Sequence, residues 1–185
     1  MNKANIESPE TNFNLGLELK NKKDYINSIK AFERVLEINS NVYQVFFNLG
    51  NIYTDLKDYD KAESNFKKAI DLEPNDHEIY TNLGNVLLQK KFYSKALESF
   101  QKAFSLSPND FRISNSVGLL QKESMNYNEA KSAFEYSIKL DEHNEFARRQ
   151  LGEILMIQGD YERGLSLVYQ TTGKISFGKI LVISS

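Results

Sequence analysis

The sequence predicts an all-α solenoid, a stack of about five helical hairpins followed by a short extended tail. Segments 43–76 and 77–110 agree at eight matched positions, each pair 34 residues apart. Within each segment the apolar residues recur every three or four positions, as on one face of a helix. A period of this length indicates stacked repeats, because one hairpin cannot bury its own apolar face. The pairs are Phe46–Tyr80, Leu49–Leu83, Gly50–Gly84, Tyr53–Leu87, Ala62–Ala96, Phe66–Phe100, Ala69–Ala103 and Pro74–Pro108.

Five glycines define the frame of the repeats. Each falls inside a predicted helix, where glycine costs about 1 kcal/mol relative to alanine. The close approach of two antiparallel helices gives a physical reason for that repeated cost. We expect Ala62, Ala96 and Ala130 on the second helices to meet these glycines. The glycines are Gly16, Gly50, Gly84, Gly118 and Gly152.

The second repeat gives the clearest helix boundaries. Its first helix is predicted over Tyr43–Asp55, and Asp58 can cap a second helix that ends before Pro74. Other repeats hold Asp24, Asn126 and Asp160 at the same capping position, and Phe92 breaks the set. The turns after the prolines end in Asp76 and Asp110, which can cap the following helices.

The repeats follow one another without a gap. Residues 1–8 hold few apolar side chains and are expected to fray. The tail is rich in β-branched residues and is predicted to be extended, against the open end of repeat 5, a second copy or a further domain. The units are repeat 1 (9–42), repeat 2 (43–76), repeat 3 (77–110), repeat 4 (111–144), a degenerate repeat 5 (145–173) and the tail (174–185).

The order of an aromatic residue, Leu-Gly, an aromatic residue or leucine, then Ala, Phe, Ala and Pro resembles the tetratricopeptide repeat. This resemblance implies a right-handed superhelix whose first helices line a concave groove. It also implies a scaffold that binds proteins or peptides, and it identifies the fold better than the function.

Composition and charge argue against several other functions. The chain has no cysteine, which excludes thiol catalysis, disulfides and cysteine-based zinc sites. A net charge of −2 argues against nucleic-acid binding, and no apolar run is long enough for membrane insertion. His77 and His143 fall at predicted turns without partners at metal-ligand spacing. We therefore expect a cytoplasmic protein that is not an enzyme and has no cofactor or metal.

Asparagine recurs on one face of the first helices. With each glycine counted as position 8, asparagine fills five of the ten sites at positions 6 and 9, whereas 19 Asn among 185 residues predict about one. These positions lie three residues apart and share one helix face. Together with two residues of repeat 4, they are our candidate peptide-binding groove: Asn14, Asn48, Asn51, Asn82, Asn85, Arg112 and Ser116.

The motif N-L-G-N, at residues 48–51 and 82–85, resembles the asparagine ladder in the tetratricopeptide region of O-GlcNAc transferase. In that family the ladder holds an extended peptide by its backbone. The alternative is that these asparagines are inherited repeat consensus or bond neighbouring helices to each other. The carboxylate clamp of chaperone-binding repeat proteins fits less well. Phe47 and Ser116 stand where that clamp needs cations, which removes most of its charge-assisted hydrogen bonds.

The sequence favours a peptide-binding adaptor and leaves two alternatives open. The chain could be the N-terminal targeting module of a glycosyltransferase-like or oxygenase-like enzyme. It could also be a structural subunit that self-associates, through its repeat edges or its tail.

Overall fold

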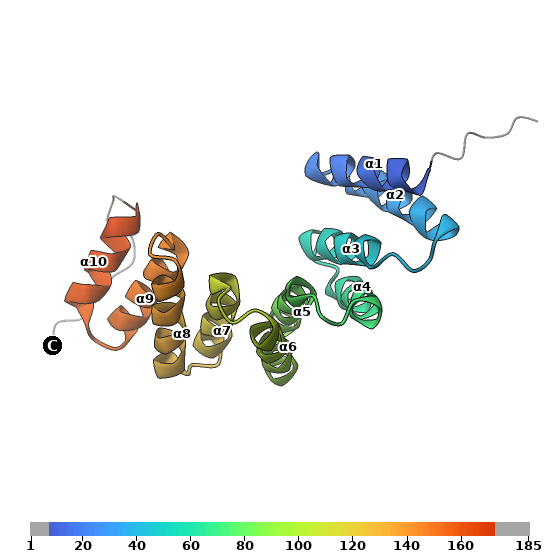
Figure 1. The fold of residues 1–185 in the computed structure, drawn as a ribbon. Helices are drawn as coiled ribbons and strands as arrows, with labels where there is room; N and C mark the ends of the chain where they lie inside the picture. The colour runs from blue at the N-terminus through green and yellow to red at the C-terminus, as the bar shows by residue number, and fades with distance from the viewer. Residues whose placement is uncertain (1–7, 173–185) are drawn as a thin grey trace, which may run out of the picture. The chain divides into compact units, whose positions relative to one another are not determined.

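The computed structural model describes residues 8–172, and this part of the chain forms ten α-helices and no strand (Figure 1). The predicted all-α fold is confirmed. The predicted extended tail, 174–185, lies outside the described residues. The helices are α1 (Pro9–Asn21), α2 (Tyr25–Ile38), α3 (Tyr43–Asp55), α4 (Tyr59–Leu72), α5 (His77–Gln89), α6 (Tyr93–Leu106), α7 (Phe111–Glu123), α8 (Tyr127–Leu140), α9 (Glu145–Ile157) and α10 (Tyr161–Thr172).

Consecutive helices pack as hairpins, α1 with α2 and so on to α9 with α10. The helix predicted over Tyr43–Asp55 is α3 itself. Helix α4 ends at Leu72, just before the Glu73-Pro74 pair that was expected to stop it. No helix among the described residues is long and apolar enough to cross a membrane.

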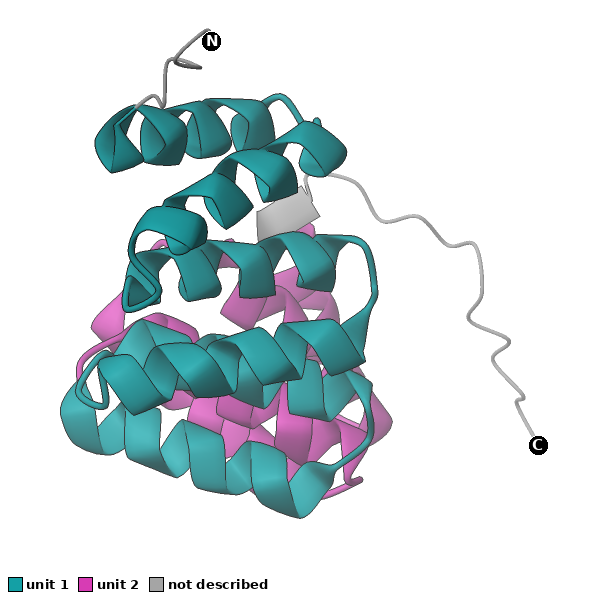
Figure 2. Cartoon of the chain, turned by 90° about the vertical axis from the view of Figure 1, so that its right-hand side faces the viewer, with its two compact units in different colours: residues 1–108 teal, residues 109–185 magenta. Residues whose placement is uncertain are grey.

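The chain divides into two compact units, residues 1–108 and 109–185 (Figure 2). Unit 1 holds α1 to α6 and unit 2 holds α7 to α10. In unit 1, α3 contacts α1 and α5 directly, so the first helices of its three hairpins lie next to one another. The contact of α2 with α3 is less extensive than that of α4 with α5.

A phenylalanine ring fills the space beside each of four frame glycines. A Cβ added to Gly84 would lie 2.5 Å from Cε1 of Phe100, closer than Cβ atoms come to any neighbour. The sequence-based prediction had named alanine as the residue that meets the glycine and had not named the phenylalanine, whose ring atoms lie nearest to an added Cβ. A phenyl ring fills more of the space beside a bare helix backbone than a methyl group does. The pairs are Gly16–Phe32, Gly50–Phe66, Gly84–Phe100 and Gly118–Phe134.

The position expected to hold alanine lies beside the glycine carbonyl instead in repeats 1 and 5. Ser28 occupies it in repeat 1, and its Oγ donates a 2.7 Å hydrogen bond to the carbonyl oxygen of Gly16. Gly164 occupies it in repeat 5, where an added Cβ would meet the carbonyl oxygen of Gly152 at 2.7 Å. The small residue therefore lets the two backbones approach, while the phenylalanine fills the space beside them.

Each turn inside a hairpin passes through the left-handed backbone region. After α3, the N–H of Lys57 (φ 59°) bonds to the carbonyl of Thr54, and the N–H of Asp58 bonds to that of Tyr53. These two bonds form a Schellman motif, which usually has glycine at its left-handed residue. Only the fifth turn has glycine there. The left-handed residues are Lys23, Lys57, Lys91, Met125 and Gly159.

Three of the predicted caps on the second helices form. The side chains of Asp24, Asp58 and Asp160 accept backbone N–H bonds of 3.2–3.3 Å from the residue three positions later. Asn126 stands at the same position but does not cap α8. Its Nδ2 donates instead to Oε1 of Gln121 at 2.9 Å, which turns the amide away from the helix end.

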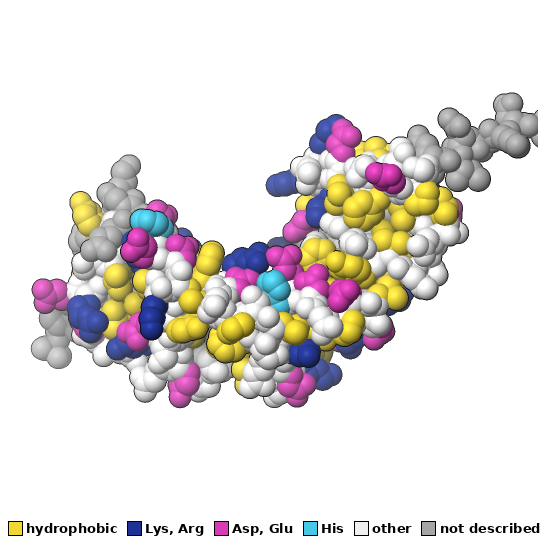
Figure 3. Space-filling view, in the orientation of Figure 1, with side chains coloured by type: hydrophobic (Ala, Val, Ile, Leu, Met, Phe, Trp, Pro, Cys, Tyr) yellow, Lys and Arg dark blue, Asp and Glu magenta, His cyan; other side chains and the backbone are white. Residues whose placement is uncertain are grey.

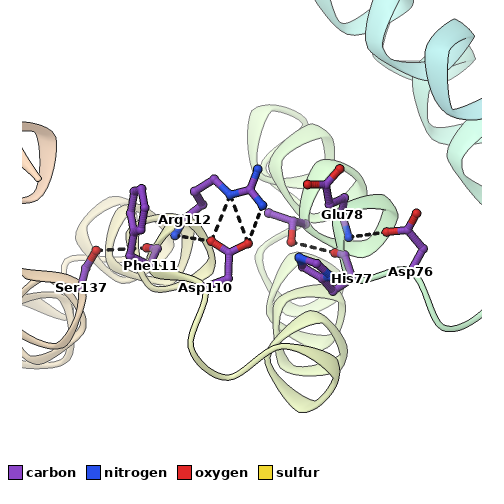
Figure 4. Close-up of polar contacts among 8 residues, drawn as sticks. Asp76, His77, Glu78, Asp110, Phe111, Arg112 and Ser137 are labelled. Carbon is purple, nitrogen blue, oxygen red and sulfur yellow. Dashed lines mark hydrogen bonds and ion pairs between the residues drawn. The ribbon is translucent and has the colours of Figure 1, made fainter. Parts of the chain in front are cut away.

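The predicted caps on the first helices also form. In unit 1 the carboxylate of Asp76 accepts the N–H of Glu78 at 2.8 Å (Figure 4). In unit 2 the carboxylate of Asp110 accepts the N–H of Arg112 at 2.9 Å and also pairs with its guanidinium.

Candidate functional site

The side chain of Asn48 is buried between α1 and α3. Nζ of Lys20 donates to its Oδ1 at 2.6 Å, and its Nδ2 donates to the carbonyl of Gln44 at 2.7 Å. Only 7% of Asn48 is exposed. Both ends of this predicted groove amide are therefore occupied within the protein, and Asn48 holds a lysine over the face that α1 and α3 share.

Asn51 and Asn82 bond to each other across adjacent first helices. Nδ2 of Asn82 donates to Oδ1 of Asn51 at 3.0 Å, and both residues are half-buried. The bond uses one end of each amide. Among residues 8–172, the side-chain nitrogen of Asn51 donates no hydrogen bond and the side-chain oxygen of Asn82 accepts none. The pair thus offers one donor group and one acceptor, which is the complement of a peptide unit.

The remaining candidates in unit 1 differ in exposure. Asn85 follows Asn82 on the same helix face and is half-buried, and its amide forms no hydrogen bond in the described part of the chain. Asn14 on α1 is exposed. The structure therefore brings Asn51, Asn82 and Asn85 together on the neighbouring helices α3 and α5.

Arg112 and Ser116 lie on α7 in unit 2. The guanidinium of Arg112 is exposed and pairs with Asp110 at 2.7 Å, so its charge is balanced locally. Ser116 is only 6% exposed.

Two lysines at one repeat position were missed by the sequence-based prediction. Lys20 of α1 bonds to Asn48 of α3 in unit 1, and Lys122 of α7 bonds to Gln150 of α9 at 2.8 Å in unit 2. Both bonds join residues 28 positions apart. The signal was present, because the two lysines are separated by three whole repeats. A lysine on a helix surface is ordinarily solvated, so its spacing alone carried little weight.

The two lysines differ in how their charge is balanced. Nζ of Lys122 also contacts Oε2 of Glu153 at 2.5 Å, which makes an ion pair. Lys20 bonds to a neutral amide, and no carboxylate among the described residues lies within ion-pair distance of it. Burial lowers the pKa of Lys20 below its ordinary value, and the charge of Asp55 only partly opposes that shift.

A buried polar network joins three helices of unit 2. Oγ of Ser137 donates to the carbonyl of Phe111 at 3.0 Å (Figure 4). It also lies 2.7 Å from Oδ1 of Asn115. Nδ2 of Asn144 donates to Ser137 at 2.9 Å, and its Oδ1 accepts the N–H of Ala147 at 3.0 Å. Asn144 thereby caps α9 and links it to α7 and α8.

Apolar surface in unit 1 gathers over α1 to α3 (Figure 3). A hollow of about 250 Å³ lies there, at the junction where α2 and α3 pack less extensively. Unit 2 has a larger open hollow of about 470 Å³ among α8, α9 and α10, with two arginines and two glutamates in its wall. The first hollow is lined by Pro9, Glu10, Phe13, Val35, Val42 and Gln44.

Solved structures share this fold at low sequence identity. MamA 41-end from Desulfovibrio magneticus RS-1 has a TM-score of 0.79 and 19% identity, with 89% of this chain and 93% of that chain covered. Pseudomonas aeruginosa pilF has a TM-score of 0.80 and 19% identity, with 90% and 78% covered. YrrB, described as a TPR protein with an unusual peptide-binding site, has a TM-score of 0.71 and 21% identity, with 92% and 89% covered.

Comparison with family models identifies the family of the chain more directly than the solved structures do. No curated protein sequence matches it. Models of the tetratricopeptide repeat match residues 9–42, 43–76 and 77–110, which together are more than half of the chain. The protein therefore belongs to the tetratricopeptide repeat family.

Proposed function

We propose that this protein is a non-catalytic adaptor that binds an extended segment of another protein along the first helices of unit 1. The observation that supports this most directly is the Asn51–Asn82 pair. An extended chain laid across α3 and α5 would receive an N–H from Asn51 and give one to Asn82. Asn85 adds a second donor and acceptor on the same face.

The strength of such binding follows from the number of hydrogen bonds. Each contributes about 0.5–1.5 kcal/mol net, and ordering an extended peptide opposes them. A few such bonds give micromolar binding at best. Because they are made to the backbone of the ligand, the binding tolerates different ligand sequences. The description of YrrB as having a peptide-binding site is consistent with this use of the fold.

The test replaces Asn51, Asn82 and Asn85 with alanine together. Alanine is the better helix former, so the variant should fold at least as well as the original. Capture of members of a random extended-peptide display library should fall at least tenfold. The matched control is Asn65→Ala, which removes an amide from α4 that bonds only within its own helix. Undiminished capture by a folded triple variant would refute peptide binding at these residues.

Self-association is the second candidate, and exposed apolar residues of unit 2 favour it. Ile157 and Tyr169 are each 54% exposed, and Tyr161 is 60% exposed. The residues that match Ile157 in the first four repeats are Asn21, Asp55, Gln89 and Glu123, which are all polar. The residues that match Tyr169 are polar as well, namely Glu33, Lys67, Gln101 and Glu135. Ile157 and Tyr169 are therefore large exposed apolar residues at positions that are otherwise polar, which is typical of a contact surface.

A second copy of the chain is the occupant that we propose for this surface. Light scattering over a range of concentrations should show a mass that rises for the original chain. It should stay at the monomer mass for Ile157→Glu combined with Tyr169→Glu. A constant monomer mass for the original chain would exclude self-association.

A further inference from the structure

Next to Lys20, the face shared by the first helices of unit 1, α1, α3 and α5, offers mainly hydrogen-bond donors. An ammonium group can only donate, so the 2.6 Å contact fixes the oxygen of Asn48 toward Lys20. The nitrogen of Asn48 is used by the carbonyl of Gln44. The oxygen and the nitrogen of Asn48 are thus each engaged within the protein, whereas two N–H groups of Lys20 remain.

The neighbouring amide adds another donor. Asn51 lies one turn beyond Asn48 on α3, and its oxygen already accepts from Asn82. Its nitrogen is the end that stays open. Lys20 and Asn51 thus present N–H groups from two adjacent helices, and a ligand that bonds to both has to bring acceptors.

The charge of Lys20 lacks a direct partner. No carboxylate of residues 8–172 lies within ion-pair distance of its Nζ. Asp55, whose charge acts on Lys20, is itself engaged at Oδ2 by the hydroxyl of Tyr25 at 2.9 Å. A half-buried cation bonded to a neutral amide gains from an incoming anion, because burial weakens the competition from water.

Lys122 shows what the same position looks like when the charge is satisfied. In unit 2 it bonds to Gln150 in the way that Lys20 bonds to Asn48, and Glu153 completes an ion pair. Asn51 is the residue of repeat 2 that corresponds to Glu153, and it is neutral. The site beside Lys20 therefore lacks the carboxylate that its counterpart has.

We infer that Lys20 is a specificity-determining residue of unit 1 that binds the carboxylate of an acidic side chain in an extended peptide. The inference rests on the proposed peptide-binding function and deepens it. One carboxylate oxygen accepts from the ammonium of Lys20 and the other from the amide of Asn51, so the ligand brings the negative charge that Glu153 provides beside Lys122. The Asn51–Asn82 pair is then shared between the acidic side chain and the backbone that carries it.

The test uses the full chain and two blocked peptides, acetyl-AVEVA-amide and its neutral counterpart acetyl-AVQVA-amide. Binding is followed by nuclear magnetic resonance of the lysine ammonium and asparagine amide groups. The acidic peptide should bind about fivefold more tightly at low salt, and the preference should shrink as salt rises. The signals that move should be those of Lys20 and Asn51.

The variant Lys20→Gln removes the charge but keeps an amide N–H that can bond to Asn48, so the fold should be retained. It should bind both peptides equally. The control Lys122→Gln changes the matching lysine of unit 2 and should keep the fivefold preference.

The possible results separate the two proposals. Equal binding of both peptides to the original chain, with the asparagine signals shifting, refutes the role of Lys20 and leaves the adaptor proposal standing. A preference that survives Lys20→Gln also refutes that role. If neither peptide moves any signal of α3 or α5, the peptide-binding proposal fails, and the role of Lys20 fails with it.

Discussion

The backbone of Gly84 lies against the ring of Phe100, and an added Cβ would come within 2.5 Å of the ring. Both residues are buried, and Phe100 is fully enclosed. The contact joins the two helices of one hairpin. A side chain at residue 84 can be accommodated only if the ring or the helix moves.

Gly84→Leu should therefore lower the free energy of unfolding by several kcal/mol through overpacking. Urea unfolding followed by circular dichroism measures the loss. Gln89→Leu places the same side chain at an exposed position of the same helix and should change stability by less than about 0.5 kcal/mol. Equal stability of the two variants would mean that α5 and α6 do not meet at Gly84.

Met125→Gly should stabilise the protein. Met125 has a φ of 60°, a conformation that costs a residue with a side chain about 1–2 kcal/mol. Glycine adopts it freely but loses more chain entropy on folding, so we expect a net gain of about 0.5–1 kcal/mol. Ser124 precedes it with a φ of −83°, and Ser124→Gly should give no gain. A lower unfolding midpoint for Met125→Gly than for the original chain would contradict this account.

Asn144→Ala should cost about 2–3 kcal/mol, because it removes the cap of α9 and leaves Ser137 without its donor. Asn126→Ala is the matched control, since Asn126 stands at a helix start without capping it. Its cost should be below about 0.5 kcal/mol. Thermal unfolding of both variants measures the difference, and similar costs would show that the buried network adds nothing.

Acid should weaken an ion cluster in unit 1 that contains Glu63. Its carboxylate contacts Lys67 and Lys90 at 2.6 Å each. Burial alone raises the pKa of Glu63, but the hydrogen bonds from both lysines outweigh it, so the pKa lies below its ordinary value of 4.5. The stabilisation is therefore present above pH 4.5 and is lost as the pH falls through the lower folded-state pKa.

Glu63→Gln should reduce stability at pH 7 and flatten its fall below pH 4.5, as measured by urea unfolding across that range. Glu98→Gln removes an exposed carboxylate of α6 and should leave the slope unchanged. An unaltered acid slope for Glu63→Gln would show that the cluster does not contribute.

The fold was predictable because the same pattern of residues occurs in several successive repeats. The limits of α3 and the caps of Asp58 and Asp76 follow from local rules, and the structure confirms them. The contact of Phe100 with Gly84 was not predicted, because the sequence shows which residues are small but does not show the orientation of an aromatic side chain. Asn126 failed as a cap since a neighbouring amide, Gln121, competes for it.

The candidate site was predictable only in outline. The repeat frame placed Asn51 and Asn82 on facing helices, but their mutual bond depends on the distance between those helices. Lys20 was missed for a similar reason. Its long side chain reaches Asn48 in the next repeat. The periodicity of a helix predicts which face a residue lies on, but not which residue of a neighbouring helix a long side chain contacts.

The glycine–phenylalanine contact also bears on how such a chain can change in length. Four hairpins contain both partners of this contact, so each of these repeats brings its own glycine and phenylalanine. Duplicating residues 43–76 in register would add one more such pair, and the new hairpin would bury its remaining apolar face against its neighbours. The array can therefore grow or shrink by whole units, and the face it presents to a partner lengthens or shortens by one pair of helices at a time.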